Sequence, residues 1–296
     1  MNLIKLNSLT DYVHIIRGEK IMNILKSKQG QAMPDKTQFF KSEAFEKIDH
    51  TEIRWMGNAS MMINSRGTNI MIDPLLEGFD MPLLIEMPIL TKDIPSLDAL
   101  LITHIDNDHY SRPTCKDVLE VCQSYHAPQY VAKVMKEEGI PGIGHDINDS
   151  FLVNDVKVTL TPVWHNWQNE SKKYQYRKWS KEDYCGYWID TLDGTIWLPG
   201  DSRLLDEHLK MPNPDVIFFD FCDNEWHITL DGAIKLANTY PQADLICIHW
   251  GCVDAPDFSP FNGNPEVLVD KVTNPERIKV LAPGEKYILN KKTRKL

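Results

Sequence analysis

The chain has 296 residues and a formal net charge of -10, with 42% hydrophobic and 25% charged residues. This length suits one large domain or two modest ones and is ample for a hydrophobic core. The acidic balance argues against broad electrostatic binding to nucleic acid, so we expect no nucleic-acid partner. Every apolar stretch falls short of the roughly 18 residues that a transmembrane helix needs, so we expect no membrane insertion.

The six cysteines are scattered along the chain without a CxxC pair, which is not the pattern of a disulfide framework. Residues 1–20 mix charged side chains with short apolar runs and lack the continuous apolar core of a signal peptide. These features predict a cytoplasmic protein. The sequence leaves the oligomeric state open, a homo-oligomer included.

Residues 1–45 have the least regular pattern of the chain, and we interpret them as an N-terminal extension with some helix. Phe39, Phe40 and Phe45 are expected to anchor this extension on a domain that spans residues 46–296.

Short apolar or alternating segments bounded by turn formers then follow along the chain, and they predict strands. The predicted strands are 52–56, 60–64, 69–73, 97–103, 156–160, 186–190, 195–198, 216–221, 245–248, 279–281 and 286–289. The predicted helices are 116–123, 130–138, 204–209 and 230–240. Strands followed by helices in two successive halves indicate an α+β sandwich of sheets flanked by helices.

Residues 104–109 read His-Ile-Asp-Asn-Asp-His, directly after the apolar run 97–103. Such a tight loop can turn all four ionisable side chains toward one point. Imidazole and carboxylate together suit zinc, iron or manganese, whereas calcium or magnesium favours oxygen ligands alone. For this hexapeptide taken alone, a solvated polar turn is the alternative interpretation.

Three further ionisable residues stand just past the ends of predicted strands. His165 follows strand 156–160, Asp201 follows strand 195–198 and a Gly turn, and His249 follows strand 245–248. Loops at strand ends converge on one rim in sheet-based folds, and chemistry concentrates there. One such residue is usually a hydrogen-bonded loop residue, but three in this order favour a metal site.

The order of these motifs resembles the metallo-β-lactamase superfamily, and within it the branch of ascorbate-phosphate lactonase-like and N-acyl-phosphatidylethanolamine phospholipase-like proteins. The similarity runs from about residue 52 to residue 289. The matching motifs are residues 55–60, 70–74, 104–109, 199–202, 229–231, 249–251 and 282–285. The resemblance implies a four-layer αββα sandwich with the N-terminal extension in front of it.

The resemblance also implies a metal centre, whose ligands carry over position by position. A first site takes His104, Asp106 and His165, a second takes Asp108, His109 and His249, and Asp201 bridges the two. Asp73 is expected to orient the metal loop without binding metal.

Asp106 departs from the family pattern, which usually has His at this position. A carboxylate is shorter and harder than imidazole and adds a negative charge, so bound water becomes less acidic. Asp106 therefore favours a harder metal such as manganese or iron, or it weakens the first site until only one ion binds. The expected cofactor is one or two divalent transition-metal ions, with zinc as the first expectation.

The chemistry that the resemblance implies is attack by a metal-bound hydroxide on a small ester, lactone or phosphate-bearing metabolite. Asp108 or Asp106 is the expected proton acceptor in this lactonase-like reaction. One alternative is phosphodiesterase action on a lipid or nucleotide. Another is a catalytically weak metal-binding protein that acts as a sensor or scaffold.

The loop 164–184 is rich in aromatic and cationic residues and is the candidate for substrate recognition. Packing of the aromatics with solvated cations is an equally weighted alternative. The residues expected to contact a small-molecule substrate are Trp167, Arg177, Lys178, Arg203 and His227.

Overall fold

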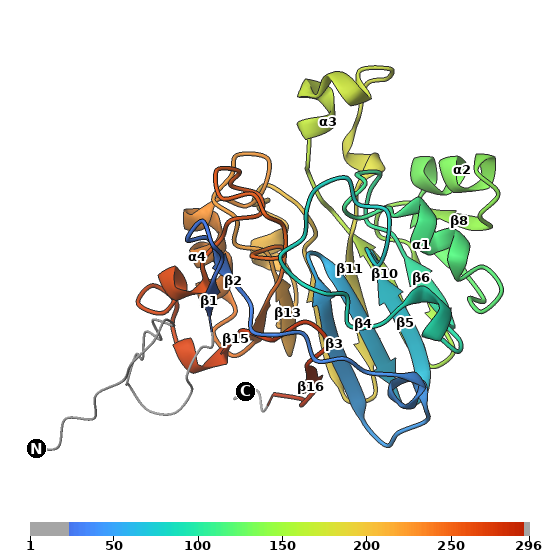
Figure 1. Ribbon diagram of the computed structural model, residues 1–296, viewed down its shortest axis with the longest axis horizontal. Helices are drawn as coiled ribbons and strands as arrows, with labels where there is room; N and C mark the ends of the chain where they lie inside the picture. Colours follow the sequence, from blue (N-terminus) through green and yellow to red (C-terminus); the bar gives the residue numbers. More distant parts are fainter. Residues whose placement is uncertain (1–23, 293–296) are drawn as a thin grey trace, which may run out of the picture.

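The computed structural model describes residues 24–292, which form two seven-stranded sheets packed face to face with helices on their outer faces (Figure 1). This is the expected αββα sandwich. A hairpin of β1 (Leu25–Lys26) and β2 (Ala32–Met33) lies in front of it in the chain.

The first sheet has the order β16-β3-β4-β5-β6-β7-β8 and is antiparallel from β16 to β5 and parallel from β5 to β8. Its strands are β3 (Thr51–Gly57), β4 (Ser60–Ser65), β5 (Thr68–Ile72), β6 (Ala99–Leu101), β7 (Tyr125–Pro128), β8 (Gly142–His145) and β16 (Lys286–Ile288).

The second sheet has the order β15-β14-β13-β12-β11-β10-β9, and its strands from β12 to β15 run parallel. Its strands are β9 (Ser150–Val153), β10 (Val156–Thr161), β11 (Gly186–Thr191), β12 (Gly194–Leu198), β13 (Val216–Phe219), β14 (Asp244–Cys247) and β15 (Ile278–Lys279).

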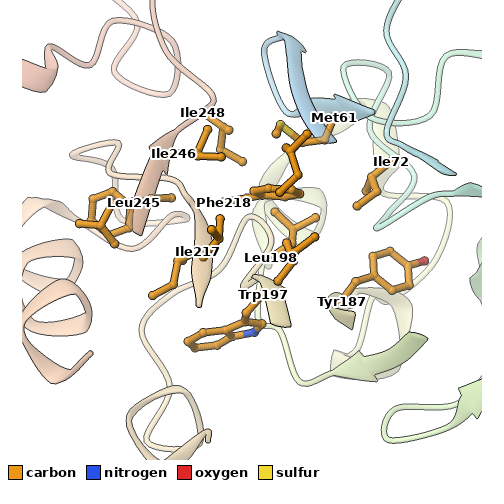
Figure 2. Close-up of a cluster of buried hydrophobic side chains, with 14 of the residues drawn as sticks. Met61, Ile72, Tyr187, Trp197, Leu198, Ile217, Phe218, Leu245, Ile246 and Ile248 are labelled. Carbon is orange, nitrogen blue, oxygen red and sulfur yellow. The ribbon is translucent and has the colours of Figure 1, made fainter. Parts of the chain in front are cut away.

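The core between the sheets follows from the two-residue period of a strand, which sends alternate side chains to opposite faces. Met61 in β4 points into the space between the sheets, whereas the next residue, Met62, packs with the helices α1 (Arg112–Asp117) and α2 (Gln129–Glu137) on the outer face. Figure 2 shows Met61 beside the side chains of Leu198 and Phe218 from the second sheet.

Helix α4 (Leu230–Thr239) covers the outer face of the second sheet. Its Ala233, Leu236 and Ala237 are buried in the same core cluster as Trp197 of β12. Thr229 caps the helix, because its hydroxyl accepts a hydrogen bond from Gly232 N at 3.3 Å. The helix layer thus places the loop before α4 at the ends of the parallel strands.

Two predicted helices are wrong. The structure has α1 at Arg112–Asp117 in place of 116–123, because Ser111 caps the helix and Pro113 occupies its first turn. At 204–209 it has only a 3₁₀ turn, His208–Lys210. Strands β7, β8 and β9 were not predicted.

The expected extension is described only from residue 24 onward, so the expectation for 1–23 lies outside the described residues. Phe40 and Phe45 are buried against the core on the α1–α2 side, as expected of anchors, whereas Phe39 is exposed. A short 3₁₀ turn, Ser42–Phe45, lies in this segment. None of the helices within residues 24–292 is long and apolar enough to cross a membrane.

Candidate metal centre

The ionisable residues that follow the strands meet at one end of the sandwich. His104 follows β6, His165 follows β10, Asp201 follows β12 and His249 follows β14. The imidazole rings of His104 and His165 have centroids 5.2 Å apart. Parallel strands end at the same edge of a sheet, which explains why residues distant in the sequence converge here.

Asp73 holds the 104–109 loop in place. Its carboxylate accepts hydrogen bonds from Thr103 N at 2.8 Å and Thr103 Oγ1 at 2.6 Å, and it lies 2.8 Å from His109 Nδ1. Nδ1 of His109 is thereby engaged, and its Nε2 is directed away from Asp73. Asp73 thus contacts both the residue before the 104–109 loop and the last residue of that loop.

The structure brings together His104, Asp106 and His165, which the sequence predicts as a first site. One oxygen of Asp106, Oδ2, lies 3.4 Å from Nε2 of His104 and 3.4 Å from Nε2 of His165. His165 Nδ1 lies 2.9 Å from the Trp226 carbonyl oxygen, which fixes the ring. His104, His165 and Asp201 also form a buried group with metal-ligand geometry.

Asp108, His109 and His249 form a second buried group of this kind. His249 Nε2 lies 3.3 Å from Asp108 Oδ2 and 3.4 Å from Asp201 Oδ2. His109 Nε2 lies 3.0 Å from the same Asp201 oxygen. Asp201 therefore stands between the two groups, where a bridging ligand is expected.

Several buried polar atoms of this centre make no hydrogen bond within residues 24–292: Nε2 of His104, Nε2 of His109 and Oδ1 of Asp106. A buried polar atom without a partner costs about 1–3 kcal/mol. The two imidazole nitrogens lie 3.4 Å and 3.0 Å from carboxylate oxygens of Asp106 and Asp201, but they make no hydrogen bond with them. Such a donor set fits divalent transition-metal ions.

The pKa values show how strongly the charges of this centre are coupled. Burial would raise the pKa of Asp108, but the charge of His109 and a hydrogen bond from His249 lower it to about 2. Burial would lower the pKa of His109, but the carboxylates of Asp201, Asp108 and Asp73 hold it well above its ordinary value. The imidazoles and carboxylates of this centre therefore lie close enough to shift one another's pKa values strongly.

His227 lies deeper in the centre than a rim residue. Its Nε2 is 3.7 Å from Asp201 Oδ2, and its Nδ1 is 2.7 Å from Asp220 Oδ2. Together with Cys222 and His249, these two residues form a further buried group with metal-ligand geometry. The sequence predicts His227 only as a substrate contact, because no local pattern shows that the chain folds back to pair it with Asp220.

The loop 164–184 forms a segment that we call the lid; it contains α3 (Trp167–Glu170) and two 3₁₀ turns, Lys172–Tyr174 and Lys181–Asp183. In Figure 1 the α3 part of the lid projects beyond the ends of the sheets. Tyr184 at its base has its ring 6.0 Å from both His104 and His165.

The predicted substrate contacts of the lid differ in their surroundings. Trp167 packs edge-on against Tyr174, with ring centroids 5.5 Å apart. Arg177 is used within the lid: its Nη2 lies 3.1 Å from Asp183 Oδ2, and its guanidinium carbon lies 3.7 Å from the Tyr130 ring centroid. Lys178 is exposed.

Arg203, two residues beyond Asp201, is half-buried, and its backbone N–H donates to the Trp164 carbonyl at 3.0 Å. Its side-chain Nε is buried and makes no hydrogen bond within the described residues.

Comparison with known proteins agrees with this geometry. A family model described as the beta-lactamase superfamily domain matches residues 68–250. An N-acyl-phosphatidylethanolamine-hydrolyzing phospholipase D from Caenorhabditis elegans is 22% identical over 228 residues, which are 67% of this chain but only 63% of that protein. A UPF0173 metal-dependent hydrolase from Methanopyrus kandleri is 23% identical over 246 residues, 79% of this chain and 98% of that protein.

Among solved structures, a metallo hydrolase from the archaeon Ignicoccus hospitalis has a similar fold, with a TM-score of 0.63 at 18% identity over 80% of this chain and 97% of that one. The chain therefore belongs to the beta-lactamase superfamily and is a metal-dependent hydrolase of the metallo-β-lactamase fold.

Proposed function

We propose that this protein hydrolyses a small ester, lactone or phosphate-bearing metabolite at the centre formed by the 104–109 loop, His165, Asp201 and His249. The observation that carries the proposal is the set of buried, unpartnered ligand atoms that converge there: Nε2 of His104, Nε2 of His109 and Oδ1 of Asp106. A merely structural polar cluster satisfies its own hydrogen bonds.

His104, Asp106 and His165 would hold one ion, Asp108, His109 and His249 would hold a second, and Asp201 would bridge them. When bound, such ions make water more acidic and polarise the bond to be cleaved. Zinc remains the first expectation, with manganese or iron favoured to the extent that Asp106 acts as a hard ligand.

Asp108 is the better placed of the two candidate proton acceptors. Its side chain is 13% exposed, compared with 7% for Asp106. Asn58 Nδ2 lies 3.2 Å from the Asp108 carbonyl oxygen and 3.4 Å from its Oδ2, which restrains the residue. These features support a carboxylate that takes a proton from the attacking water.

The unpartnered Nε of Arg203 supports a substrate that carries a phosphate or carboxylate group. The alternative, phosphodiester hydrolysis on a lipid, is favoured by one observation, the similarity to a phospholipase D that hydrolyses N-acyl-phosphatidylethanolamine.

The test is a hydrolysis panel on metal-loaded protein: small esters, lactones and phosphate-bearing esters in one set, and lipid and nucleotide phosphodiesters in the other. We expect turnover in the first set that is abolished by a chelator and by Asp201→Asn. Turnover only of phosphodiesters would favour the alternative. Tight metal binding without any turnover would favour a sensor or scaffold.

A further inference from the structure

His227 has the same kind of surroundings as His109, a residue expected to bind metal. The Nδ1 atom of His109 lies 2.8 Å from the buried carboxylate of Asp73, and its Nε2 lies 3.0 Å from Oδ2 of Asp201. The Nδ1 atom of His227 lies 2.7 Å from the buried carboxylate of Asp220, and its Nε2 lies 3.7 Å from the same Asp201 oxygen. Each imidazole therefore has one nitrogen fixed by a carboxylate and the other turned toward Asp201.

The Asp220 carboxylate is held in an orientation that fixes the His227 ring. Its second oxygen, Oδ1, accepts a hydrogen bond from Cys222 N at 2.9 Å, so both of its oxygens are engaged. Histidine ligands of metals commonly donate their other ring N–H to a carboxylate or a carbonyl, which fixes the tautomer and the orientation of the ring. With its Nδ1–H donated to Asp220, His227 has its lone pair on Nε2, the atom that faces Asp201.

The distances around His227 are those of neighbours in one coordination shell. Two ligand atoms bound to one tetrahedral ion at about 2.0–2.1 Å lie about 3.3 Å apart, and two atoms that share an ion at all lie within about 4.2 Å. The separation of 3.7 Å between His227 Nε2 and Asp201 Oδ2 falls within this limit. The His227 ring centroid also lies 5.2 Å from that of His165 and 5.1 Å from that of His249, so His227 neighbours ligands of both expected sites.

The opposite edge of the His227 ring, which faces Asp220, does not form a separate metal site. In the group of Asp220, Cys222, His227 and His249, the Sγ atom of Cys222 lies 2.8 Å from the Pro260 carbonyl oxygen, and Nδ1 of His249 lies 2.9 Å from the same oxygen. These atoms, like Nδ1 of His227, are already engaged by hydrogen bonds within the protein. The atom of His227 that remains for an ion is Nε2, on the side of Asp201.

We propose that His227 is a further ligand of the metal centre, which binds an ion through Nε2 beside Asp201 and is oriented by Asp220. This inference rests on the proposed function, because it presupposes a metal ion next to Asp201. Asp106 supplies an oxygen where the family pattern usually has an imidazole, and His227 would add a nitrogen donor to the centre.

The experiment compares the cobalt(II)-loaded full chain with its His227→Gln and His126→Gln variants. His126 is a matched control, because it is 6% exposed against 4% for His227 but lies in β7, where it pairs with His145. A histidine bound to cobalt(II) has its ring N–H resonance shifted far outside the ordinary range of the proton NMR spectrum. We expect one shifted N–H resonance fewer in His227→Gln and an unchanged set in His126→Gln.

Cobalt(II) affinity, measured by competition with a chelator of known strength, gives a second readout. We expect His227→Gln to weaken the more labile ion by about 100-fold or more, since a direct ligand matters more than an outer partner. Asp220→Asn should weaken it by about 10–100-fold, the usual effect of losing an outer partner, and this variant also tests the inference if His227→Gln does not fold. In the His227→Gln background, Asp220→Asn should cause no further loss, because the two residues act through one bond.

Unchanged cobalt affinity and an unchanged set of shifted resonances in His227→Gln would overturn the inference, and so would unchanged affinity in Asp220→Asn. A raised KM in His227→Gln without any change in cobalt binding would overturn it in favour of the substrate contact that the sequence predicts. The proposed function would stand in each of these cases. Failure of the unmodified protein to bind cobalt(II) would instead contradict the proposed function.

Discussion

Two buried acidic clusters occupy opposite ends of the same parallel strands, and they differ in how their charges are satisfied. At the carboxyl ends of β12 to β14, Asp201 sits among imidazoles that make no aligned hydrogen bond with it. At the amino ends, Asp215 accepts from Thr195 N and Lys292 N, each at 2.8 Å. Asp244 lies 2.7 Å from Lys292 Nζ and also accepts from the hydroxyl of Tyr287.

The difference separates a structural cluster from a binding centre. Both ends bury carboxylates, so burial and acidity alone do not identify the functional one. At the amino ends the chain supplies both the donors and the positive charge, whereas at the carboxyl ends ligand atoms such as Nε2 of His104 remain unpartnered. An external cation is therefore needed at one end only.

The largest expected effect comes from Asp201→Asn. The amide keeps the shape of the side chain but removes the negative charge between the two ligand groups. We expect the loss of at least one ion per chain and a fall in hydrolysis of more than about 100-fold, since a direct ligand matters more than an outer partner. Elemental analysis and steady-state kinetics measure both. A variant with full metal content and activity would refute the bridging role.

Metal removal should make the stability of the protein depend on pH in a definite direction. Burial lowers the pKa values of His109 and His249, but Asp201 and its neighbouring carboxylates raise them well above the ordinary value of 6.5. A histidine whose pKa is higher in the folded than in the unfolded protein stabilises the folded state. This stabilisation is complete at pH values below the unfolded-state pKa, and it is lost as pH rises through the folded-state pKa.

We therefore expect the melting temperature of chelator-treated protein to fall as pH rises from about 6 toward 9. The melting temperature of metal-loaded protein should fall less over this range, because the ions replace these protons. Its metal affinity should increase with pH. Parallel melting curves for the two forms across this range would argue against proton–metal exchange at these imidazoles.

At the other end of the strands, Asp244→Asn should affect stability but not metal. The substitution removes the charge paired with Lys292, whose side chain is 28% exposed, so solvent screening limits the loss. We expect the free energy of unfolding to fall by roughly 1–2 kcal/mol, measured by denaturant titration, with unchanged metal content. Metal loss from Asp244→Asn would remove the distinction between the two clusters.

The smallest effects should come from the cations of the lid. Arg177→Ala loses the ion pair with Asp183 and the stacking on Tyr130, so we expect a destabilisation of about 1 kcal/mol. Lys178→Ala removes an exposed charge and should change stability by less than about 0.5 kcal/mol. A large rise in KM for an anionic substrate in Lys178→Ala, with unchanged stability, would show that Lys178 contacts the substrate.

The parts of the molecule that depend on local patterns were predictable from the sequence. Strand β10 has clear apolar alternation, and the four ionisable residues of the 104–109 loop lie within six consecutive positions. Strands β8 and β9 lack such a signal, because β8 reads Gly-Ile-Gly-His and β9 is largely exposed.

Features that depend on chain reversal were not predictable in the same way. Asp220 and His227 are seven residues apart and meet only because the loop before α4 turns back. The spacing of residues along the chain does not indicate this contact.

Metal content per chain, measured by elemental analysis on protein purified without added metal, tests the contrast between the two clusters most directly. The account predicts bound divalent transition metal in the unmodified protein, the same content in Asp244→Asn, and a reduced content in Asp201→Asn. Metal-free unmodified protein that takes up no ion on titration, or equal metal content in all three, would contradict it.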